Sequence, residues 1–295
     1  MTKIKTRYNT RRHLPLILPS AVILLTSLFI LQSVREAACK SSDPLRYHGG
    51  LRNSTDDRRL NSKQLETVLK SLREKTGFLQ MSFDENGFLN VGDRTKFDGG
   101  SATARSLIST ATECDRAIDL ESHNSSSSVA FARLARPVIF QNRSSGAAID
   151  VYPLELDFSD FKKLRGDDRV IAAFDIGFVI MHELGHAVLN LSDNLESIND
   201  LGECEEYINR IRRELNIPQR LNYIAQTIKS PMTMTRASGE MAELIFTHTD
   251  ENRANSKGQK LYLRWEANLV GPVRQNVAET LLKPGSAKPV TAALR

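Results

Sequence analysis

Residues 170–193 form the longest apolar stretch in the second half of the chain, and its pattern is helical. Ile171, Phe174, Phe178 and Leu189 recur at the spacing of one helix face, and the stretch contains no proline. Asp167 and Asp168 precede it and suit a helix N-terminus, whereas Ser192, Asp193 and Asn194 suit its exit. The pattern predicts one mostly buried helix of about twenty residues at the centre of a domain.

A second helix is predicted directly downstream, over residues 202–215. Its apolar residues Cys204, Ile208, Ile211 and Leu215 share one face, and Asn216 and Pro218 end it.

Weaker patterns fill the rest of a domain that we expect to span residues 99–275. We expect a helix over 101–120, strands over 129–135 and 147–158, and a hairpin that joins 242–247 to 260–270. These elements predict an α+β fold. Residues 33–98 are polar and charged, with one helical stretch over 62–75, and are predicted to be a linker or stalk, whereas 276–295 are expected to form a loose tail.

The N-terminus carries a different signal. Residues 1–13 hold five basic residues and no acid, and residues 14–32 follow without a charge, which is long enough to span a bilayer. The basic flank predicts a cytoplasmic N-terminus, with everything beyond the span outside the cytoplasm. Arg35 and Glu36 disfavour cleavage, so an uncleaved anchor is preferred over the alternative, a cleaved signal peptide and a secreted protein.

Charge adds little beyond this topology. The net charge is +5, from 40 basic and 35 acidic residues. Without the five basic residues that precede the apolar span the chain is balanced at 35 against 35, so nothing indicates a nucleic-acid partner.

The central predicted helix carries candidate chemistry in His182, Glu183 and His186. Residues four apart lie one turn above each other, so both imidazoles can reach one ion while Glu183 lies beside it. This is the H-E-x-x-H arrangement of zinc metalloproteases. The alternative, that these three residues only pack on a buried helix, is weakened because glutamate is almost never fully buried without a partner.

A zinc site of this kind needs a third protein ligand. The extended motif with a third histidine is excluded, because Leu189 and Ser192 occupy its glycine and histidine positions. A glutamate on the second helix is the other solution. Glu205 is preferred because it borders the apolar face and precedes Asn209, which can hydrogen-bond a ligating histidine, and Glu206 is the alternative. A solvated acidic helix N-terminus explains the same glutamates without a metal.

With His182, Glu183, His186 and a glutamate about twenty residues beyond, the chain resembles the gluzincin branch of the zincin metallopeptidases. The resemblance covers residues 165–225, and the stretch after Ile211 is also similar to uncharacterised bacterial H-E-x-x-H proteins. It implies a zincin-like fold, in which a mixed sheet lies above the active-site helix and substrate runs along the sheet's edge strand. The chain departs from the branch at Asn209, where an aspartate is expected.

The predicted function is zinc-dependent hydrolysis of a protein or peptide substrate outside the cytoplasm, with Glu183 as the base toward water bound to zinc. Tyr223 and His248 are candidate donors to the developing oxyanion. One alternative is a zincin-fold protein that binds zinc without catalysis. Another is a membrane-anchored structural or adhesion protein in which the motif is accidental.

Three cysteines are too few for a disulfide framework. Cys114 and Cys204 could pair in an oxidising compartment, with Cys39 left near the membrane, or both could be buried thiols. Cys204 as a metal ligand is considered less favourable than glutamate.

Overall fold

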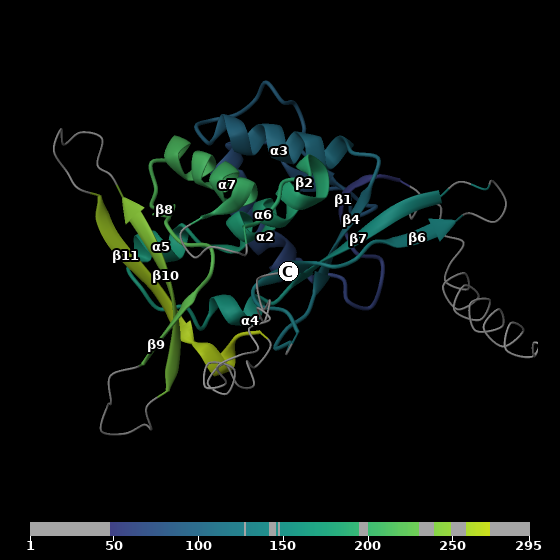
Figure 1. The fold of residues 1–295 in the computed structure, drawn as a ribbon. Helices are drawn as coiled ribbons and strands as arrows, with labels where there is room; N and C mark the ends of the chain where they lie inside the picture. The colour runs from purple at the N-terminus through teal and green to yellow at the C-terminus, as the bar shows by residue number, and fades with distance from the viewer. Residues whose placement is uncertain are drawn as a thin grey trace, which may run out of the picture. The chain divides into compact units, whose positions relative to one another are not determined.

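The computed structural model describes residues 48–126, 128–141, 146, 148–194, 200–229, 239–248 and 258–271. Within them the fold is α+β, with a mixed five-stranded sheet, a smaller antiparallel sheet and several helices (Figure 1). The predicted membrane span over residues 14–32, the tail over 276–295 and Cys39 lie outside the described residues.

The larger sheet combines three parallel strands with two antiparallel ones. Strands β1 (Gly50–Asn53), β4 (Ala117–Ser122) and β7 (Ala148–Leu156) run parallel, and β5 (Ala132–Leu134) and β6 (Val138–Gln141) pair with β7 in the opposite direction. The order is β1-β4-β7-β5, with β6 beside the other end of β7. Strand β5 therefore lies at the edge of this sheet among the described residues, and both predicted strands over 129–135 and 147–158 are confirmed.

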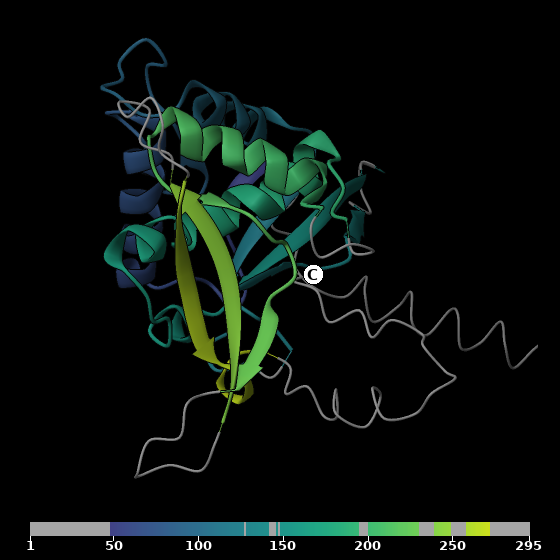
Figure 2. The ribbon, with the colours of Figure 1, turned by 60° about the vertical axis from the view of Figure 1, so that its left-hand side comes forward.

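The smaller sheet is built on the predicted hairpin, which is confirmed. Strands β10 (Glu240–His248) and β11 (Gln259–Glu266) pair antiparallel, and β8 (Gln219–Arg220) and β9 (Gln226–Lys229) pair with β10. Figure 2 shows this sheet in front of the helices. Its inner face carries Trp265, whose ring meets Phe131 at a centroid distance of 5.2 Å, so the two sheets share one core. A short hairpin of β2 (Ser82–Phe83) and β3 (Leu89–Asn90) completes the strands.

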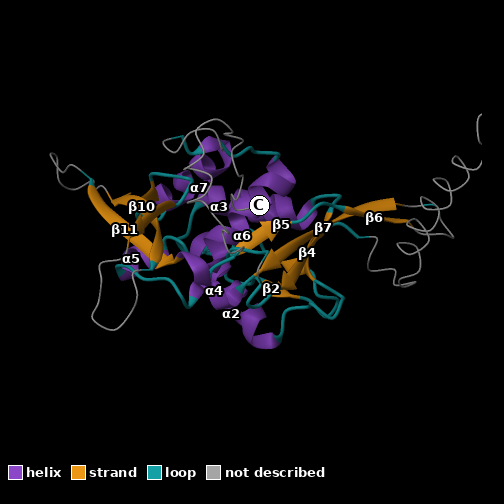
Figure 3. Cartoon of the chain, turned by 60° about the horizontal axis from the view of Figure 1, so that its bottom comes forward, coloured by secondary structure: helices purple, strands orange, loops and turns teal. Residues whose placement is uncertain are grey.

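Helix α6 (Ile176–Leu189) is the central element. Of its residues, Ile176–Gly185 and Ala187 are all buried. Around it pack α2 (Ser62–Thr76), α3 (Ala102–Glu113) and α7 (Gly202–Glu214), and strand β5 also contacts it. The short elements α4 (Phe158–Phe161), α5 (Asp168–Ala172) and η2 (Ala267–Leu269) connect the larger parts. Figure 3 shows the helices between the strands of the two sheets.

Residues 168–189 are long and apolar enough to cross a membrane by length and composition, and they are the one such stretch within the described part of the chain. In that stretch, 78% of the most apolar window is buried inside the protein. Most of this stretch therefore lies in the protein core, as the sequence predicted.

The prediction of one continuous helix over 170–193 was wrong, because Asp175 divides it. Its carboxylate accepts hydrogen bonds from the backbone N–H groups of Gly177 and Phe178, which makes it the N-cap of α6 and ends α5 before it. The helix predicted over 101–120 also ends early, at Glu113, because residues 117–122 enter the sheet as β4 between β1 and β7.

The prediction of a linker over residues 33–98 was wrong for the described part, 48–98. Strand β1 pairs with β4, and the segment contributes four fully buried side chains to the core, those of Leu51, Val68, Leu72 and Met81. The charged residues that gave this segment its polar character lie mainly on the outer faces and turns. One of them, Arg52, is buried but pairs with Asp119 at 2.6 Å. The helix predicted over 62–75 is confirmed as α2.

Candidate metal centre

Helix α6 brings the two histidines of the motif to one side, as their spacing predicts. Their Nε2 atoms are 3.2 Å apart, and the two rings meet edge to face at a centroid distance of 4.8 Å. His182 is buried, and His186 is partly exposed. The Nε2 atoms therefore converge on one point next to the helix.

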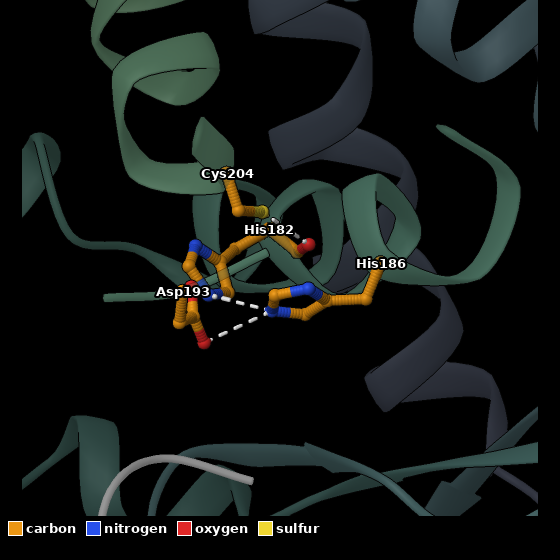
Figure 4. A group of neighbouring side chains, drawn as sticks. All are labelled: His182, His186, Asp193 and Cys204. Atoms are coloured by element: carbon orange, nitrogen blue, oxygen red, sulfur yellow. Dashed lines mark hydrogen bonds and ion pairs between the residues drawn. The ribbon is translucent and has the colours of Figure 1, made fainter. Parts of the chain in front are cut away.

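Asp193 approaches the same point from the loop after α6. Asn190 ends the helix in the left-handed conformation, with a φ of 56°, and this reverses the chain. The carboxylate of Asp193 then lies 3.3 Å from His182 Nε2 and 3.2 Å from His186 Nε2. Figure 4 shows Asp193 facing both rings, with dashed lines that join His186 to Asp193 and to His182.

The far nitrogens of both rings also face acceptors. His186 Nδ1 lies 2.7 Å from the carbonyl oxygen of Leu191, and His182 Nδ1 lies 3.2 Å from a carboxylate oxygen of Glu205. The acceptor at His186 Nδ1 holds the proton on that nitrogen and leaves the Nε2 lone pair free to bind a metal. His182 Nδ1 lies within ion-pair distance of Glu205 but makes no hydrogen bond among the described residues.

Glu205, the third ligand expected from the sequence, lies behind His182 and away from the Nε2 atoms. It is 1% exposed, and its two oxygens lie 2.5 Å from Arg212 and 3.2 Å from Arg220. Burial acts to raise its pKa, but the charges of Arg212 and Arg220 lower the pKa well below its ordinary value. Glu205 is thus an ionised counterion for two buried guanidinium groups.

The other residues expected on α7 have different positions. Glu206 is exposed. Asn209 is buried and contacts neither histidine among the described contacts. Its side chain accepts a hydrogen bond from Arg212 and exchanges two with the backbone of Arg220, so it supports the arginines.

Tyr223 belongs to the centre, whereas His248 does not. The Tyr223 hydroxyl donates to Asp193 at 2.5 Å, and its ring stacks on His182 at a centroid distance of 5.6 Å. Burial raises the pKa of Tyr223, so this hydroxyl keeps its proton. His248 lies at the end of β10 opposite Gln259, and no described contact joins it to the site.

Glu183 points toward the edge of the larger sheet. It is 2% exposed, and one of its oxygens accepts a hydrogen bond of 3.0 Å from the backbone N–H of Leu134 in β5. Burial raises the pKa of Glu183 above its ordinary value. A small pocket beside it is lined by Phe174, Phe178 and Val179 together with polar residues of the site.

The charges of the centre are strongly coupled. Burial alone would lower the pKa of both histidines, but the Asp193 carboxylate, which lies 3.3 Å from His182 Nε2 and 3.2 Å from His186 Nε2, outweighs it. The pKa of His186 rises to about 10, and that of His182 lies well above its ordinary value. Burial acts to raise the pKa of Asp193, but the two histidines overcome it and lower that pKa. In the absence of metal, the two imidazoles therefore share one carboxylate, which favours their protonated form.

Cys114 and Cys204 are both free thiols. The Cys114 sulfur donates to the carbonyl of Arg116 at 3.1 Å, and the Cys204 sulfur donates to the carbonyl of His182 at 3.1 Å. No disulfide joins these two residues, and the expectation of two buried thiols is met by Cys204 alone, since Cys114 is partly exposed.

A second group of potential metal ligands lies on the larger sheet, and it differs from the first in that its carboxylates pair with arginines. Glu121, His123 and Glu155 bring ligand atoms within 4.8 Å of one another. However, Arg58 pairs with Glu121 at 3.0 Å and Arg133 pairs with Glu155 at 2.5 Å. Both carboxylates are already neutralised, so this group is an ion-pair network. Among the described ion pairs, none joins Asp193 to a lysine or arginine.

Sequence reasoning missed Asp193 and the two arginines. Asp193 stands seven residues after His186, inside the stretch that was assigned only to capping the helix exit. The available signal was an aspartate just beyond an Asn that can adopt the left-handed conformation. Comparison of this chain with protein-family models, with curated proteins and with solved structures finds no match.

Proposed function

We propose that this protein is a zinc-dependent peptidase whose metal ligands are His182, His186 and Asp193. The supporting observation is the size of the triangle formed by the two Nε2 atoms and the Asp193 carboxylate group. Two atoms that are each 2.0–2.1 Å from one tetrahedral ion lie roughly 3.3 Å apart. The two Nε2 atoms lie 3.2 Å apart, His182 Nε2 lies 3.3 Å from Asp193 Oδ1, and His186 Nε2 lies 3.2 Å from the other oxygen, Oδ2.

Two further features fit a zinc ion. The side chains of the triangle offer two imidazoles and a carboxylate, which are common zinc ligands. Asp193 Oδ1 is also buried without a hydrogen-bond partner, although it lies within ion-pair distance of His182. Such an oxygen is costly to bury unless something else satisfies it.

Asp193 is favoured over Glu205 as the third ligand because of charge. Moving Glu205 to a metal would leave Arg212 and Arg220 buried without their counterion, and the penalty for one unpaired buried charge is about 3–5 kcal/mol. Glu205 is better suited to orienting His182 through Nδ1, the role that sequence reasoning gave to Asn209.

The surrounding elements support a zincin-like arrangement. Helix α6 lies against β5, the edge strand of a mixed sheet. Ala135 donates to Pro153 of β7, so the N–H of the preceding residue, Leu134, points away from β7 and reaches Glu183. An extended substrate that pairs with this edge would pass directly over the glutamate and the histidines.

The chemistry follows from these positions. A zinc ion at the triangle supplies a Lewis acid that polarises a peptide carbonyl and acidifies water. Glu183, with its raised pKa, takes a proton from the attacking water and returns it to the leaving amine. The carbonyl of Leu191 holds His186 in the required tautomer, and the Glu205 carboxylate lies 3.2 Å from His182 Nδ1. Tyr223 fixes the orientation of Asp193.

We place this activity outside the cytoplasm, tethered to the membrane. The support is the uncharged run over residues 14–32 and the five basic residues that precede it.

Metal content tests the ligand set. The purified full chain should hold about one zinc ion, and His186→Ala and Asp193→Ala should each lose it. Glu206→Ala, which removes an exposed carboxylate from the same helix as Glu205, is the matched control and should retain the metal. A wild-type protein without zinc after incubation with the ion would refute the proposal, and retention of zinc by Asp193→Ala would refute the ligand assignment.

Peptide cleavage tests the reaction. Glu183→Gln should keep the zinc but lower the rate of cleavage of a peptide library by about 100-fold or more. Cleavage at the wild-type rate would exclude Glu183 as the base. If the zinc-loaded wild type cleaves no peptide in the library, the protein binds zinc without being a peptidase.

A further inference from the structure

Cys204 places a fourth potential ligand at the metal centre. One ligand atom from each of His182, His186, Asp193 and Cys204 lies within 4.8 Å of the others. Cys204 is 0% exposed and comes from the first turn of α7. Figure 4 shows its sulfur over the turn of α6 that joins the two histidines.

The glycine between the histidines gives this sulfur its space. A Cβ atom at Gly185 would lie 2.8 Å from Cys204 Sγ, which is too close for any real contact. Glycine inside a helix costs about 1 kcal/mol relative to alanine. Helix α6 bears that cost at the position where the sulfur of another helix approaches the metal ligands.

The loop that carries Asp193 is tied to the turn that carries Cys204. The backbone N–H of Cys204 donates to the carbonyl of Ser192 at 3.0 Å, and the Ser192 hydroxyl donates to Glu203 at 2.8 Å. Asp193 and Cys204 are therefore positioned by the same contacts, although eleven residues separate them in sequence. This link brings an anionic oxygen and a sulfur to the two imidazoles together.

We propose that Cys204 is a fourth protein ligand that closes the metal site when no substrate is bound. This inference rests on the proposed metal site. Two imidazoles, a carboxylate and a thiolate complete a tetrahedral zinc sphere, and a sphere of four protein ligands leaves no open position. The soft thiolate also favours zinc over magnesium or calcium.

The exchange of ligands at the fourth position transfers only a proton, so it needs no oxidant, reductant or other reagent. When the sulfur turns from the His182 carbonyl to the metal, the S–H bond breaks, the proton passes to solvent and a sulfur–metal bond forms. Binding of a substrate carbonyl at the fourth position would break that bond, and the thiolate would take a proton back from solvent. The resting protein is then latent, and catalysis needs the thiol to leave.

Cobalt substitution tests this directly, because a thiolate ligand gives cobalt(II) a near-ultraviolet charge-transfer band that nitrogen and oxygen ligands do not give. The wild-type full chain loaded with cobalt should show the band. Cys204→Ser should lack it while still binding about one cobalt per chain, with affinity lowered at least ~10-fold. Cys114→Ser removes a thiol that lies outside the group, and it should keep the band.

A band that is absent from cobalt-loaded wild type, or that persists in Cys204→Ser, would overturn the proposal whether or not the variant folds well. Failure of the wild type to bind cobalt at all would overturn the metal site itself, and metal content separates that result from the former. As a second readout, zinc-loaded Cys204→Ala should cleave peptides faster than wild type, and a slower rate at full zinc occupancy would contradict latency.

Discussion

At the scale of single residues, Glu205 is the buried counterion of two arginines. Its carboxylate faces Arg212, Arg220 and His182, and all three of these side chains are buried. Arg212 and Arg220 also donate to backbone carbonyls, so neither can turn out to solvent without losing further bonds.

Glu205→Gln should therefore lower the free energy of unfolding by about 3–5 kcal/mol, since it leaves two buried cations with one neutral partner. Zinc affinity should fall about 10- to 100-fold, because His182 loses its charged acceptor. Urea denaturation and zinc competition measure the two effects. The exposed Glu206→Gln should change neither, and a stable Glu205→Gln protein would show that the arginines are not balanced by this carboxylate.

Substitutions at Gly185 and Cys204 should have non-additive effects on the free energy of unfolding. Gly185→Ala should be destabilising, because its Cβ would overlap the sulfur 2.8 Å away and overpacking costs about 1–3 kcal/mol. In a Cys204→Ala background the same change should stabilise the protein by up to ~1 kcal/mol, because alanine is the better helix former. A double-mutant cycle by denaturation of the metal-free protein measures this, and an unchanged sign would show that something other than the sulfur requires the glycine.

Local spacing explains which site residues could be predicted. His182, Glu183 and His186 share one helix, so a distance of four in sequence fixes their geometry. Glu205 does turn inward as its helical phase predicted, but the two arginines that occupy its oxygens could not be inferred from α7 alone. The position of Asp193 depends on the left-handed conformation of Asn190 and on contacts with α7. Neither can be inferred from a periodic pattern of apolar residues.

At the scale of elements, Asp175 sets where helix α6 begins. It caps α6 and also pairs with Lys75 of α2 at 2.6 Å and with the hydroxyl of Ser71 at 2.8 Å. Lys75 is 5% exposed and has few other ways to satisfy its charge.

Asp175→Ala should reduce the free energy of unfolding by more than ~2 kcal/mol, because it removes a helix cap and isolates a buried lysine. Asp167→Ala provides the matched control, since Asp167 caps α5 in the same way but is exposed. Its effect on thermal denaturation should be clearly smaller. Equal effects would mean that the buried lysine contributes nothing.

The elements themselves were largely predictable, and the exceptions have a common cause. Helices α2 and α7 and the β10–β11 hairpin have strong local periodicity, and they form close to the predicted bounds. The break before α6 depends on partners from α2, about a hundred residues earlier. Strand β4 forms where a helix was expected, because β1 and β7 provide backbone partners on both sides. Long-range pairing of this kind overrides local propensity.

At the scale of the whole molecule, zinc should stabilise the fold in a pH-dependent manner. The pKa of His186 in the metal-free protein is raised to about 10, so the stability that its proton provides is complete below the ordinary pKa of 6.5 and is lost as the pH rises toward 10. Zinc must displace that proton, so zinc binds more tightly as the pH rises and His186 becomes less protonated.

The rise in melting temperature on addition of zinc should thus be larger at pH 8.5 than at pH 6, and zinc affinity should rise in parallel. Differential scanning calorimetry with and without a chelator measures the rise. His186→Ala should show no zinc-dependent shift at either pH. A shift that grows as the pH falls would mean that the ion binds elsewhere.

The contact between α2 and the start of α6 has a practical consequence for dividing this chain. A fragment cut at the apparent change in composition near residue 99 would keep every proposed ligand, yet it would lack both the neighbour of β4 and the partners of Asp175. Such a fragment would expose apolar surface along α6 and precipitate instead of reporting on catalysis. The smallest soluble piece worth expressing starts before Gly50.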